Sequence, residues 1–249
     1  MIFYNIKIYV IIYMEDITIL IPTWNRSKWN PLILLNLKLQ DYPHDKLKVI
    51  IDDDSDTDKQ FKISEELEEF KRVLHPIQIT YIDNKPKRSI GKKRNDLIKE
   101  CTTKIFCFMD TDDIYINTYI SHSYQTLKEK NVGCVGSDKM LFCMTDRNFD
   151  LHAIDCGDRA HLIHEATIMA TKKWFKSSCG FSNNSVGEGK ELFTGIKNVA
   201  ITEIGKIMCC VQHKNNSVEK LQFAKEENKL TFQIADAYKD LLKNILELE

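Results

Sequence analysis

The stretch Phe106-Cys107-Phe108-Met109-Asp110-Thr111-Asp112-Asp113 changes within a few residues from wholly apolar to acidic. An apolar run of this length predicts a buried strand, and the acids after it then lie at the carboxyl end of that strand. Open α/β sheets bind their ligands at that end. Two carboxylates one residue apart suit Mg²⁺ or Mn²⁺, which take one or two protein carboxylates together with phosphate oxygens. The stretch indicates a metal–nucleotide site or, taken alone, a solvated acidic turn.

Strand and helix patterns alternate on either side of this stretch. Apolar strands are expected at residues 17–21, 47–51, 77–82 and 105–109, with helices between them at residues 27–39, 59–73 and 89–101. This alternation indicates βαβ units, so we predict an α/β fold with a Rossmann-like, mostly parallel sheet flanked by helices. Strands then follow more closely, at residues 133–136, 140–144, 166–170 and 207–211.

Polar residues follow three of the predicted strands. They are residues 22–23, 52–53 and 110–112. Because the carboxyl ends of parallel strands meet at one edge of a sheet, we expect the three groups to lie together. Residues 91–95, Gly-Lys-Lys-Arg-Asn, add cations and helix N–H groups suited to a diphosphate. This convergence favours a nucleotide site over an isolated acidic turn.

Length and composition exclude several classes of protein. A chain of 249 residues suits one α/β domain. Its net charge of −1 gives no basic surface for nucleic acid. The eight cysteines form no CxxC pair, which argues against zinc and fits a reducing, cytoplasmic compartment.

The two ends of the chain differ from residues 14–217, the expected main domain. Residues 1–13 are almost wholly apolar but too few for a membrane span of about 20 residues. Three alternatives stand for this extension: translation starts at Met14, or the extension forms an extra edge strand, or it is a weak membrane tether. Residues 218–249 have the pattern of an amphipathic helix, which either covers the sheet or pairs with a second copy in a homodimer.

The motifs, taken in order, resemble those of family 2 glycosyltransferases with the GT-A fold. They are residues 19–26 (ILIPTWNR), 49–55 (VIIDDDS), 91–95 (GKKRN) and 109–113 (MDTDD). The sequence of residues 90–95 is most similar to that of glycosyltransferase-like proteins of large DNA viruses. A viral protein of this kind is expected in the host cytoplasm. The resemblance implies a nucleotide-binding front half and an acceptor-side C-terminal half. It also implies a metal-dependent, inverting transfer of a sugar from a nucleotide-diphosphate sugar, with UDP expected, to a hydroxyl of a glycan, protein or lipid.

The resemblance also implies roles for individual residues. Contacts with the nucleotide are expected from Pro22, Thr23, Asn25, Arg26, Asp52, Asp53, Lys93, Arg94, Asp110 and Asp113. Within this set, Asp53 matches the position that reads uracil. The cation, Mn²⁺ or Mg²⁺, is expected at Asp110, Asp112 and His213. For His213 an ordinary surface histidine is the alternative.

The catalytic base departs from the family pattern. Family members carry Glu-Asp at the start of an acceptor-side helix, and Gly189 stands here in place of the Asp. Glu188 is the expected base and Glu191, three residues later on the same helical face, is the second candidate. Both also fit an alternative role as acids favoured by the helix dipole. The dipeptide His164-Glu165 resembles the start of the family's sugar-pocket strand.

Three rival classes were compared with this interpretation. A haloacid-dehalogenase-type phosphatase requires Thr or Val two residues after its second Asp and carries its motif near the chain start. Here Ile114 stands at that position and two predicted βα units precede the motif, so this class is disfavoured. A sugar-1-phosphate nucleotidyltransferase requires a glycine-rich basic loop where residues 22–25 read Pro-Thr-Trp-Asn. A catalytically inactive nucleotide- or carbohydrate-binding protein of the same fold is the alternative that Gly189 supports. The choice of donor sugar and acceptor is expected in the irregular residues 146–162 and the loop at residues 177–187.

Overall fold

The computed structural model describes residues 14–61, 64–83, 86–155, 163–195, 197–214, 216 and 224–248. The apolar extension at residues 1–13 and the start of the expected C-terminal helix, residues 218–223, lie outside them. None of the helices in the described part combines the length and apolar character that crossing a bilayer requires.

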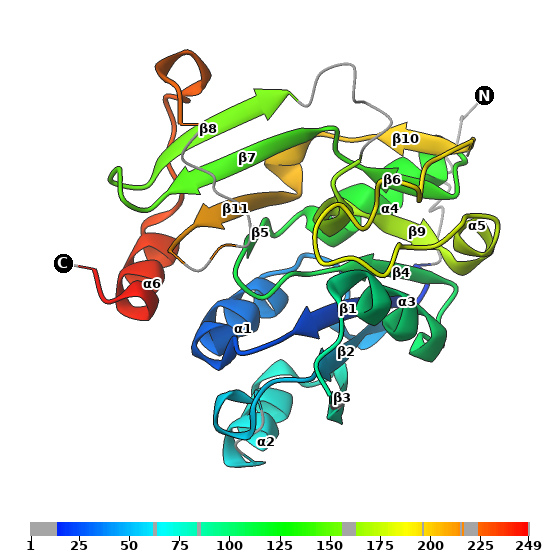
Figure 1. The fold of residues 1–249 in the computed structure, drawn as a ribbon, viewed down its shortest axis with the longest axis horizontal. Coiled ribbons are helices and arrows are strands. Elements are labelled where there is room, and N and C mark those ends of the chain that lie inside the picture. The colour runs from blue at the N-terminus through cyan, green and yellow to red at the C-terminus, as the bar shows by residue number, and fades with distance from the viewer. Residues whose placement is uncertain are drawn as a thin grey trace, which may run out of the picture.

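A seven-stranded sheet forms the centre of the molecule, in the order β10-β6-β9-β4-β1-β2-β3 (Figure 1). Its strands are β1 (Ile17–Thr23), β2 (Leu47–Asp53), β3 (Gln78–Asp83), β4 (Ile105–Phe108), β6 (Cys134–Gly136), β9 (Met169–Thr171) and β10 (Val199–Ile201). The pairs formed by β1 with β2 and β4, by β2 with β3 and by β6 with β10 are parallel, and β9 is antiparallel to both of its neighbours. The predicted α/β class with a mostly parallel sheet is confirmed.

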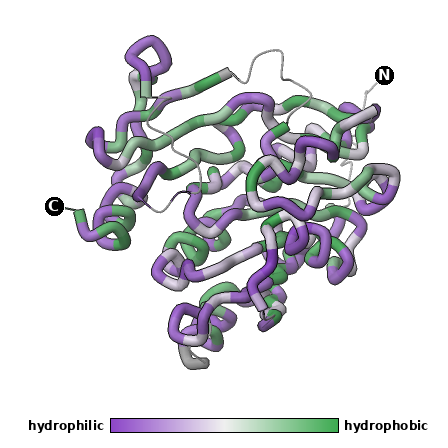
Figure 2. Tube along the Cα trace, viewed as in Figure 1, coloured by the Kyte–Doolittle hydropathy of each residue, from purple (hydrophilic) through white to green (hydrophobic). Residues whose placement is uncertain are grey.

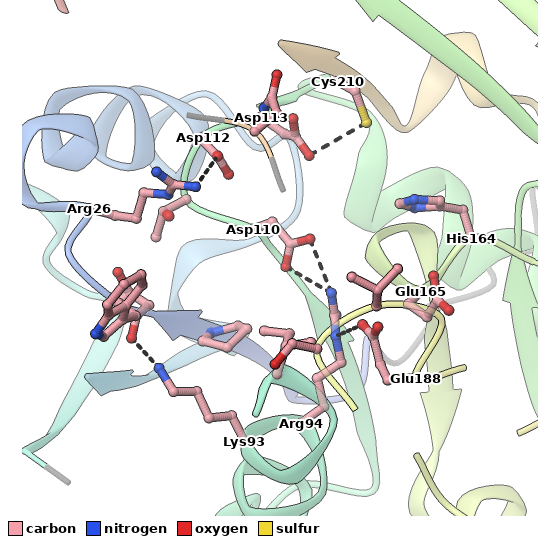
Figure 3. Close-up of a pocket in the computed structure, with 18 of the residues that line it drawn as sticks. Arg26, Lys93, Arg94, Asp110, Asp112, Asp113, His164, Glu165, Glu188 and Cys210 are labelled. Atoms are coloured by element: carbon pink, nitrogen blue, oxygen red, sulfur yellow. Dashed lines mark hydrogen bonds and ion pairs between the residues drawn. The ribbon is translucent and has the colours of Figure 1, made fainter. Parts of the chain in front are cut away.

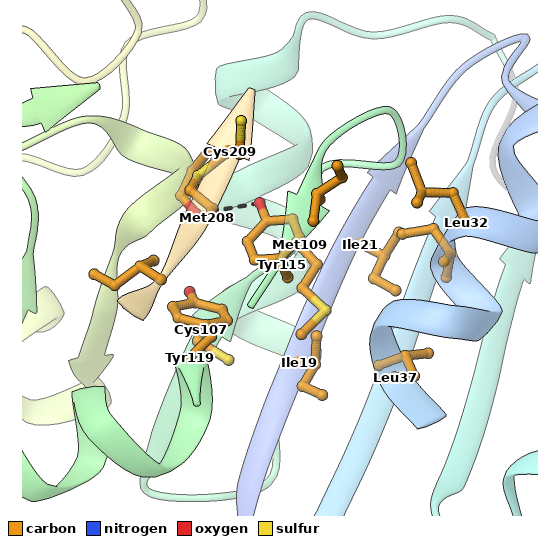
Figure 4. Packing of buried hydrophobic residues seen from close by; sticks show 14 of the residues in the cluster. Ile19, Ile21, Leu32, Leu37, Cys107, Met109, Tyr115, Tyr119, Met208 and Cys209 are labelled. Atoms are coloured by element: carbon orange, nitrogen blue, oxygen red, sulfur yellow. Dashed lines mark hydrogen bonds between the residues drawn. The ribbon is translucent and has the colours of Figure 1, made fainter. Parts of the chain in front are cut away.

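Helices cover both faces of this sheet. They are α1 (Asn30–Lys38), α2 (Ser64–Leu74), α3 (Ile90–Glu100), α4 (Tyr119–Glu129) and α5 (Lys172–Lys176), while the C-terminal α6 (Asp236–Leu246) packs against α1. The side chains of a strand alternate between faces, so Ile19 and Ile21 pack with Leu37 of α1 (Figure 4), while Leu20 packs with Leu97 of α3. Burying each such side chain contributes about 1.5–3 kcal/mol. Because apolar residues of β1 point to both faces of the sheet, a layer of helices packs on each face.

A second sheet has four strands, in the order β5-β11-β7-β8, and lies in the part of the chain after β4. It consists of β5 (Ile114–Tyr115), β11 (Met208–Gln212), β7 (Lys139–Met144) and β8 (Asp150–Asp155). Met208 and Cys209 pack beside Tyr115 and Tyr119 in the same core as β1 (Figure 4). The most hydrophobic stretches lie in the sheets and the buried helix faces, and most connecting loops are hydrophilic (Figure 2). The second sheet therefore shares one core with the first.

The expectation of an irregular segment from residue 146 was wrong for β8. Residues 150–155 pair with β7 over its whole length, from Lys139–Asp155 to Met144–Asp150. The stretch Asp-Leu-His-Ala-Ile-Asp has few β-branched residues, so its strand character depends on the partner strand rather than on local preference. Residues 156–162 lie outside the described residues.

The expected C-terminal helix is shorter than its pattern. Helix α6 covers Asp236–Leu246, whereas residues 224–235 contain only a 3₁₀ turn at Glu226–Asn228. The Leu230 N–H donates to the Leu151 carbonyl at 2.8 Å, so part of this stretch is held along β8 instead of continuing a helix. Leu242 of α6 is fully buried in the shared core. The helix thus covers its own chain, and pairing with a second copy stays a prediction.

Candidate active site

A pocket of about 540 Å³ lies beyond the carboxyl ends of β1 and β4. Pro22 and Thr23 line it from the end of β1, Arg26 lines it from the loop that follows, and residues 110–113 line it from the loop after β4. Three other parts of the chain complete the wall of the pocket. They are helix α3 with residues 87–88 before it, the loops at residues 164–165 and 185–188, and side chains of the second sheet. The predicted convergence of the first and fourth strand ends is confirmed.

Arg94 connects the two acidic parts of this pocket. Its Nη2 donates to both oxygens of Asp110 at 3.1 Å, and its Nε lies 3.3 Å from Glu188 Oε1 (Figure 3). The guanidinium lies 4.7 Å from the ring centre of Phe108. Burial opposes the charge of Arg94, but the carboxylates of Asp110, Glu188 and Glu165 outweigh it and raise its pKa. Arg94 therefore stays charged and fixes Asp110 at the strand end.

Asp112 is held by groups from two distant segments. His213 Nε2 lies 2.9 Å from Asp112 Oδ2, and Arg26 Nη2 lies 3.3 Å from the same oxygen. The His213 ring packs 4.7 Å from Trp29, at the start of α1. His213 follows β11, so the second sheet brings it to the end of β4. The His213 side chain is buried, which excludes the alternative that His213 is an ordinary surface histidine.

The donors around Asp112 fit a divalent cation that shares its ligands with a substrate. A carboxylate oxygen and an imidazole nitrogen are both ligands that Mn²⁺ accepts. Asp110, the third expected ligand, is already bound by Arg94. No group of three or more His, Cys, Asp or Glu side chains within the described ranges could hold a metal by itself. If a cation binds here, Asp112 and His213 would hold it and phosphate oxygens and water would complete its coordination shell.

The structure does not bring Asp53 to the pocket. Its carboxylate is buried and accepts from the Ser55 N–H at 2.9 Å, the Phe61 N–H at 2.7 Å and the Tyr81 hydroxyl at 2.9 Å. These donors fix the turn after β2 and the neighbouring β3. The expected contact of Asp53 with uracil is therefore not supported by its placement.

Asp52 lies below the pocket in a network of buried charges. It pairs with Arg88, whose backbone N–H donates to Asp54 at 2.5 Å. Lys93 lines the pocket as expected, and its amine contacts Asp54 and the Thr23 carbonyl. Burial lowers the pKa of Lys93 in spite of the Asp54 charge. Asp52 and Asp54, at and directly after the end of β2, thus balance the charges of Arg88 and Lys93, which line the pocket.

Two further candidates, Asn25 and Asp113, have structural partners. Asn25 has φ 53°, in the left-handed region that asparagine tolerates, and its side chain exchanges hydrogen bonds with Asp56 at 2.8 and 3.0 Å. It does not line the pocket. Asp113 does line it, but its Oδ1 accepts from the Val211 N–H at 3.0 Å and its Oδ2 contacts Cys210 Sγ. Asn25 therefore ties the β1 loop to the β2 loop, and Asp113 ties the β4 loop to β11.

The expected acceptor-side helix at Glu188 is a series of turns. Gly187 has φ 65°, and two glycines around Glu188 disfavour a helix there. Glu188 lines the pocket, as expected for a base, whereas Glu191 is exposed and lies outside the lining. Burial raises the pKa of the Glu188 carboxyl, Arg94 opposes the rise and Glu165 adds to it.

Several lining residues carry no signal in the sequence. Lys87 and Arg88 precede α3 outside every motif, and the Lys87 amine lies 3.1 Å from the ring centre of Trp24. Met140, Phe142 and Ile154 reach the pocket from the second sheet, where they read as ordinary strand residues.

Comparisons with known proteins agree with the fold and with the strand-end motifs. Residues 18–181 match the family described as Glycosyl transferase family 2. Poly(ribitol-phosphate) beta-N-acetylglucosaminyltransferase TarS of Staphylococcus aureus is 29% identical over 104 residues, which are 42% of this chain. The matched region spans only 17% of the length of TarS.

Solved structures share the fold at low sequence identity. TarS 1-349 from S. aureus, in complex with UDP-GlcNAc, has a TM-score of 0.60 at 13% identity, covering 93% of this chain and 71% of that chain. The mannosyltransferase PcManGT from Pyrobaculum calidifontis, in complex with GDP-Man and Mn²⁺, has a TM-score of 0.60 at 18% identity, covering 82% and 59%. These relatives are bacterial and archaeal, so the expected likeness to viral proteins stays a prediction. Since the family match extends over more than half of its length, the chain belongs to glycosyl transferase family 2.

Proposed function

We propose that the chain is a metal-dependent, inverting glycosyltransferase that moves a sugar from a nucleotide-diphosphate sugar to an acceptor hydroxyl. The observation that supports this most is the arrangement of charges in the pocket. Asp112, which His213 contacts from outside the pocket lining, lies on one side, while Glu165 and Glu188 lie on the other (Figure 3), with the Asp110–Arg94 pair between the two sides. An inverting transfer requires a cation near the leaving group and a base near the acceptor. The two must lie on opposite sides of the sugar.

The nucleotide is expected on the side of the β1 loop. Pro22 and Thr23 offer backbone and hydroxyl groups there, and Arg26, Lys87 and Arg88 offer cations. UDP is the expected nucleotide from family resemblance. The named relatives were solved with UDP-GlcNAc and with GDP-Man, so both nucleotides belong in a test.

The diphosphate is expected next to the ion pair of Arg26 with Asp112. A bound cation at Asp112 and His213 would neutralise the negative charge that develops on the leaving nucleoside diphosphate. Asp110, fixed by Arg94, would orient this end of the donor without itself being available as a strong cation ligand. Glu188 and Glu165 both line the pocket, which supports them as candidates for taking the proton of the acceptor hydroxyl.

An inactive binding protein of the same fold is the second candidate. Gly189 supports it, because this residue cannot supply the carboxylate expected there. The pairing of Asp112 with Arg26 also supports it, because an arginine competes with a cation for the carboxylate. The two candidates differ in turnover and not in nucleotide binding.

Hydrolysis of nucleotide sugars tests the proposal. The wild type is expected to release nucleoside diphosphate slowly from a UDP- or GDP-sugar when Mn²⁺ is present. Asp112→Asn is expected to reduce this rate at least about tenfold, since loss of a ligand lowers cation affinity. The matched control is Asp58→Asn, because Asp56-Thr57-Asp58 repeats the tripeptide of residues 110–112 but is exposed and outside the pocket.

Each result assigns the site differently. Turnover that survives in Asp112→Asn would show the cation assignment to be wrong. Binding of UDP or GDP without turnover of any donor, with and without acceptor mixtures, would favour the inactive binding protein.

A further inference from the structure

Two glutamates from different segments face the same side of the pocket. Glu165 begins the 3₁₀ turn Glu165–Thr167 ahead of β9, and Glu188 lies in the turns after residue 181. Both line the pocket, and Figure 3 shows them side by side next to Arg94, away from Asp112. Their charges interact, since Glu165 contributes to the raised pKa of Glu188. The chain thus has two carboxylates for one proton-accepting position.

Glu188 is already committed to a partner. Its side chain is 9% exposed, and its Oε1 lies 3.3 Å from Arg94 Nε. Its backbone carbonyl accepts from the Ser182 N–H at 2.9 Å, which fixes the turn around it. A carboxylate that neutralises a buried guanidinium is restrained in position, and taking up a proton would weaken that ion pair.

Glu165 occupies a space that exists only because residue 189 is glycine. Its Oε1 accepts from the Gly189 N–H at 2.9 Å. A Cβ at residue 189 would lie 2.4 Å from Glu165 Oε1 and 2.5 Å from its Cγ, far inside contact distance. Within the part of the chain that the structure describes, the Glu165 carboxylate has no other hydrogen bond or ion pair. One oxygen is therefore fixed by a backbone N–H and the other is available.

We infer that Glu165 is the catalytic base and that Glu188 is a positioning residue that holds Arg94. This assignment rests on the proposed transferase function. As the acceptor oxygen forms its bond to the anomeric carbon, the bond from that carbon to the diphosphate oxygen breaks and its electron pair leaves with the diphosphate. The acceptor proton passes to the available oxygen of Glu165 and from there to solvent. Glycine at residue 189 is then what admits a base from another segment.

Moving the carboxylate from residue 165 to residue 189 tests this inference. The probes are Mn²⁺-dependent hydrolysis of UDP-GlcNAc and of GDP-mannose, and calorimetric binding of UDP and GDP. Glu165→Gln, nearly isosteric, is expected to lower kcat by at least about 100-fold and to leave nucleotide affinity unchanged. It should also abolish the acidic limb of the pH–rate profile, which a purely structural role would leave in place.

The double variant Glu165→Ala with Gly189→Asp is the decisive rescue. Residue 189 has no positive φ in the structure, and removal of the Glu165 side chain frees the space that a Cβ there needs. We expect the double variant to recover at least about tenfold over Glu165→Ala, because the new carboxylate lies near the emptied position. Gly189→Asp alone, with Glu165 present, should gain nothing and lose stability through the clash.

Controls separate folding, this assignment and the function itself. Glu100→Gln, at an exposed glutamate at the end of α3, should keep the wild-type rate. If Glu165→Gln does not fold, Glu165→Ala, which also removes the carboxylate, gives the same comparison of kcat with nucleotide affinity. Wild-type kcat in Glu165→Gln, or full loss in Glu188→Gln with none in Glu165→Gln, would overturn the assignment alone. A wild type that neither binds nor hydrolyses the probes would overturn the proposed function, and the assignment with it.

Discussion

Asp53 lies at the end of β2 and Asp112 lies in the loop after β4, two strands that are both paired with β1, yet their surroundings give them opposite roles. Asp53 is surrounded by donors of its own chain, from Ser55, Phe61 and Tyr81, and lies outside the pocket. Asp112 faces the pocket beside Arg26 and His213. The sequence shows only that each acid follows an apolar run, so it identifies the sheet edge but not which acid faces the ligand.

At Asp53 we expect a loss of stability without a loss of nucleotide binding. Asp53→Ala leaves two buried N–H groups and a hydroxyl without their acceptor, which should cost about 3 kcal/mol of unfolding free energy. Denaturant unfolding measures this cost, and Asp58→Ala, at an exposed aspartate, is the control. Unchanged stability together with lost UDP affinity would instead restore Asp53 as a base-reading residue.

Glu188 should make stability depend on pH. Burial is the main cause of its raised pKa, so the folded state favours the protonated carboxyl more than the unfolded chain does. Its contribution to stability is then present below the ordinary pKa of 4.5 and is lost as pH rises through the raised folded pKa. Glu188→Gln stays neutral, so its Tm relative to wild type should rise as the pH is raised from 4 to 8. A Tm difference independent of pH, as expected for the exposed Glu100→Gln, would contradict this.

At the scale of elements, the N-terminal turn of α3 packs in direct backbone contact with the loop at residues 181–189. The Gly91 N–H donates to the Asn184 carbonyl at 3.1 Å. A Cβ at Gly91 would lie 1.8 Å from the Ser182 carbonyl oxygen and 2.9 Å from Glu188 Cβ. Helix α3 therefore sets the position of the loop that carries Glu188.

Gly91→Ala is expected to displace this loop from α3. Overpacking of this kind costs about 1–3 kcal/mol, and the shift of Glu188 should lower donor hydrolysis more than it lowers nucleotide affinity. Thermal unfolding and the two assays measure these effects. Gly205→Ala is the matched control, because a Cβ there meets nothing within 4 Å. Equal behaviour of the two variants would mean that the loop moves freely and that α3 does not position Glu188.

Elements could be predicted where local pattern and tertiary context agree. Strands β1, β2 and β4 are apolar runs that are buried along nearly their whole length, so their burial is visible in the sequence. Strand β8 and the stretch before α6 could not be predicted in this way. Their conformations depend on pairing with β7 and on the Leu230–Leu151 hydrogen bond. Periodicity within residues 150–155 or 224–235 does not contain that information.

At the scale of the whole molecule, the pocket lies where the two sheets meet. His213 follows β11 of the second sheet and contacts Asp112 after β4, across 101 residues of sequence. Arg94 and Asp110 could be paired by motif order, and Glu165 was indicated only by a resemblance, whereas Lys87 and the lining side chains of β7 and β8 are brought in by the topology alone. The strand-end residues Pro22, Thr23 and Asp110 of the pocket were therefore predictable, whereas the contribution of the second sheet was not.

Calorimetric titration of the wild type with UDP and with GDP, each with and without Mn²⁺, tests the central claim most directly. The account predicts that one of the two nucleotides binds with an affinity that Mn²⁺ raises at least about tenfold, since the diphosphate supplies the cation ligands that Asp112 and His213 leave open. Absence of binding by both nucleotides, in the presence of Mn²⁺, would contradict the assignment of this pocket as a nucleotide-sugar site.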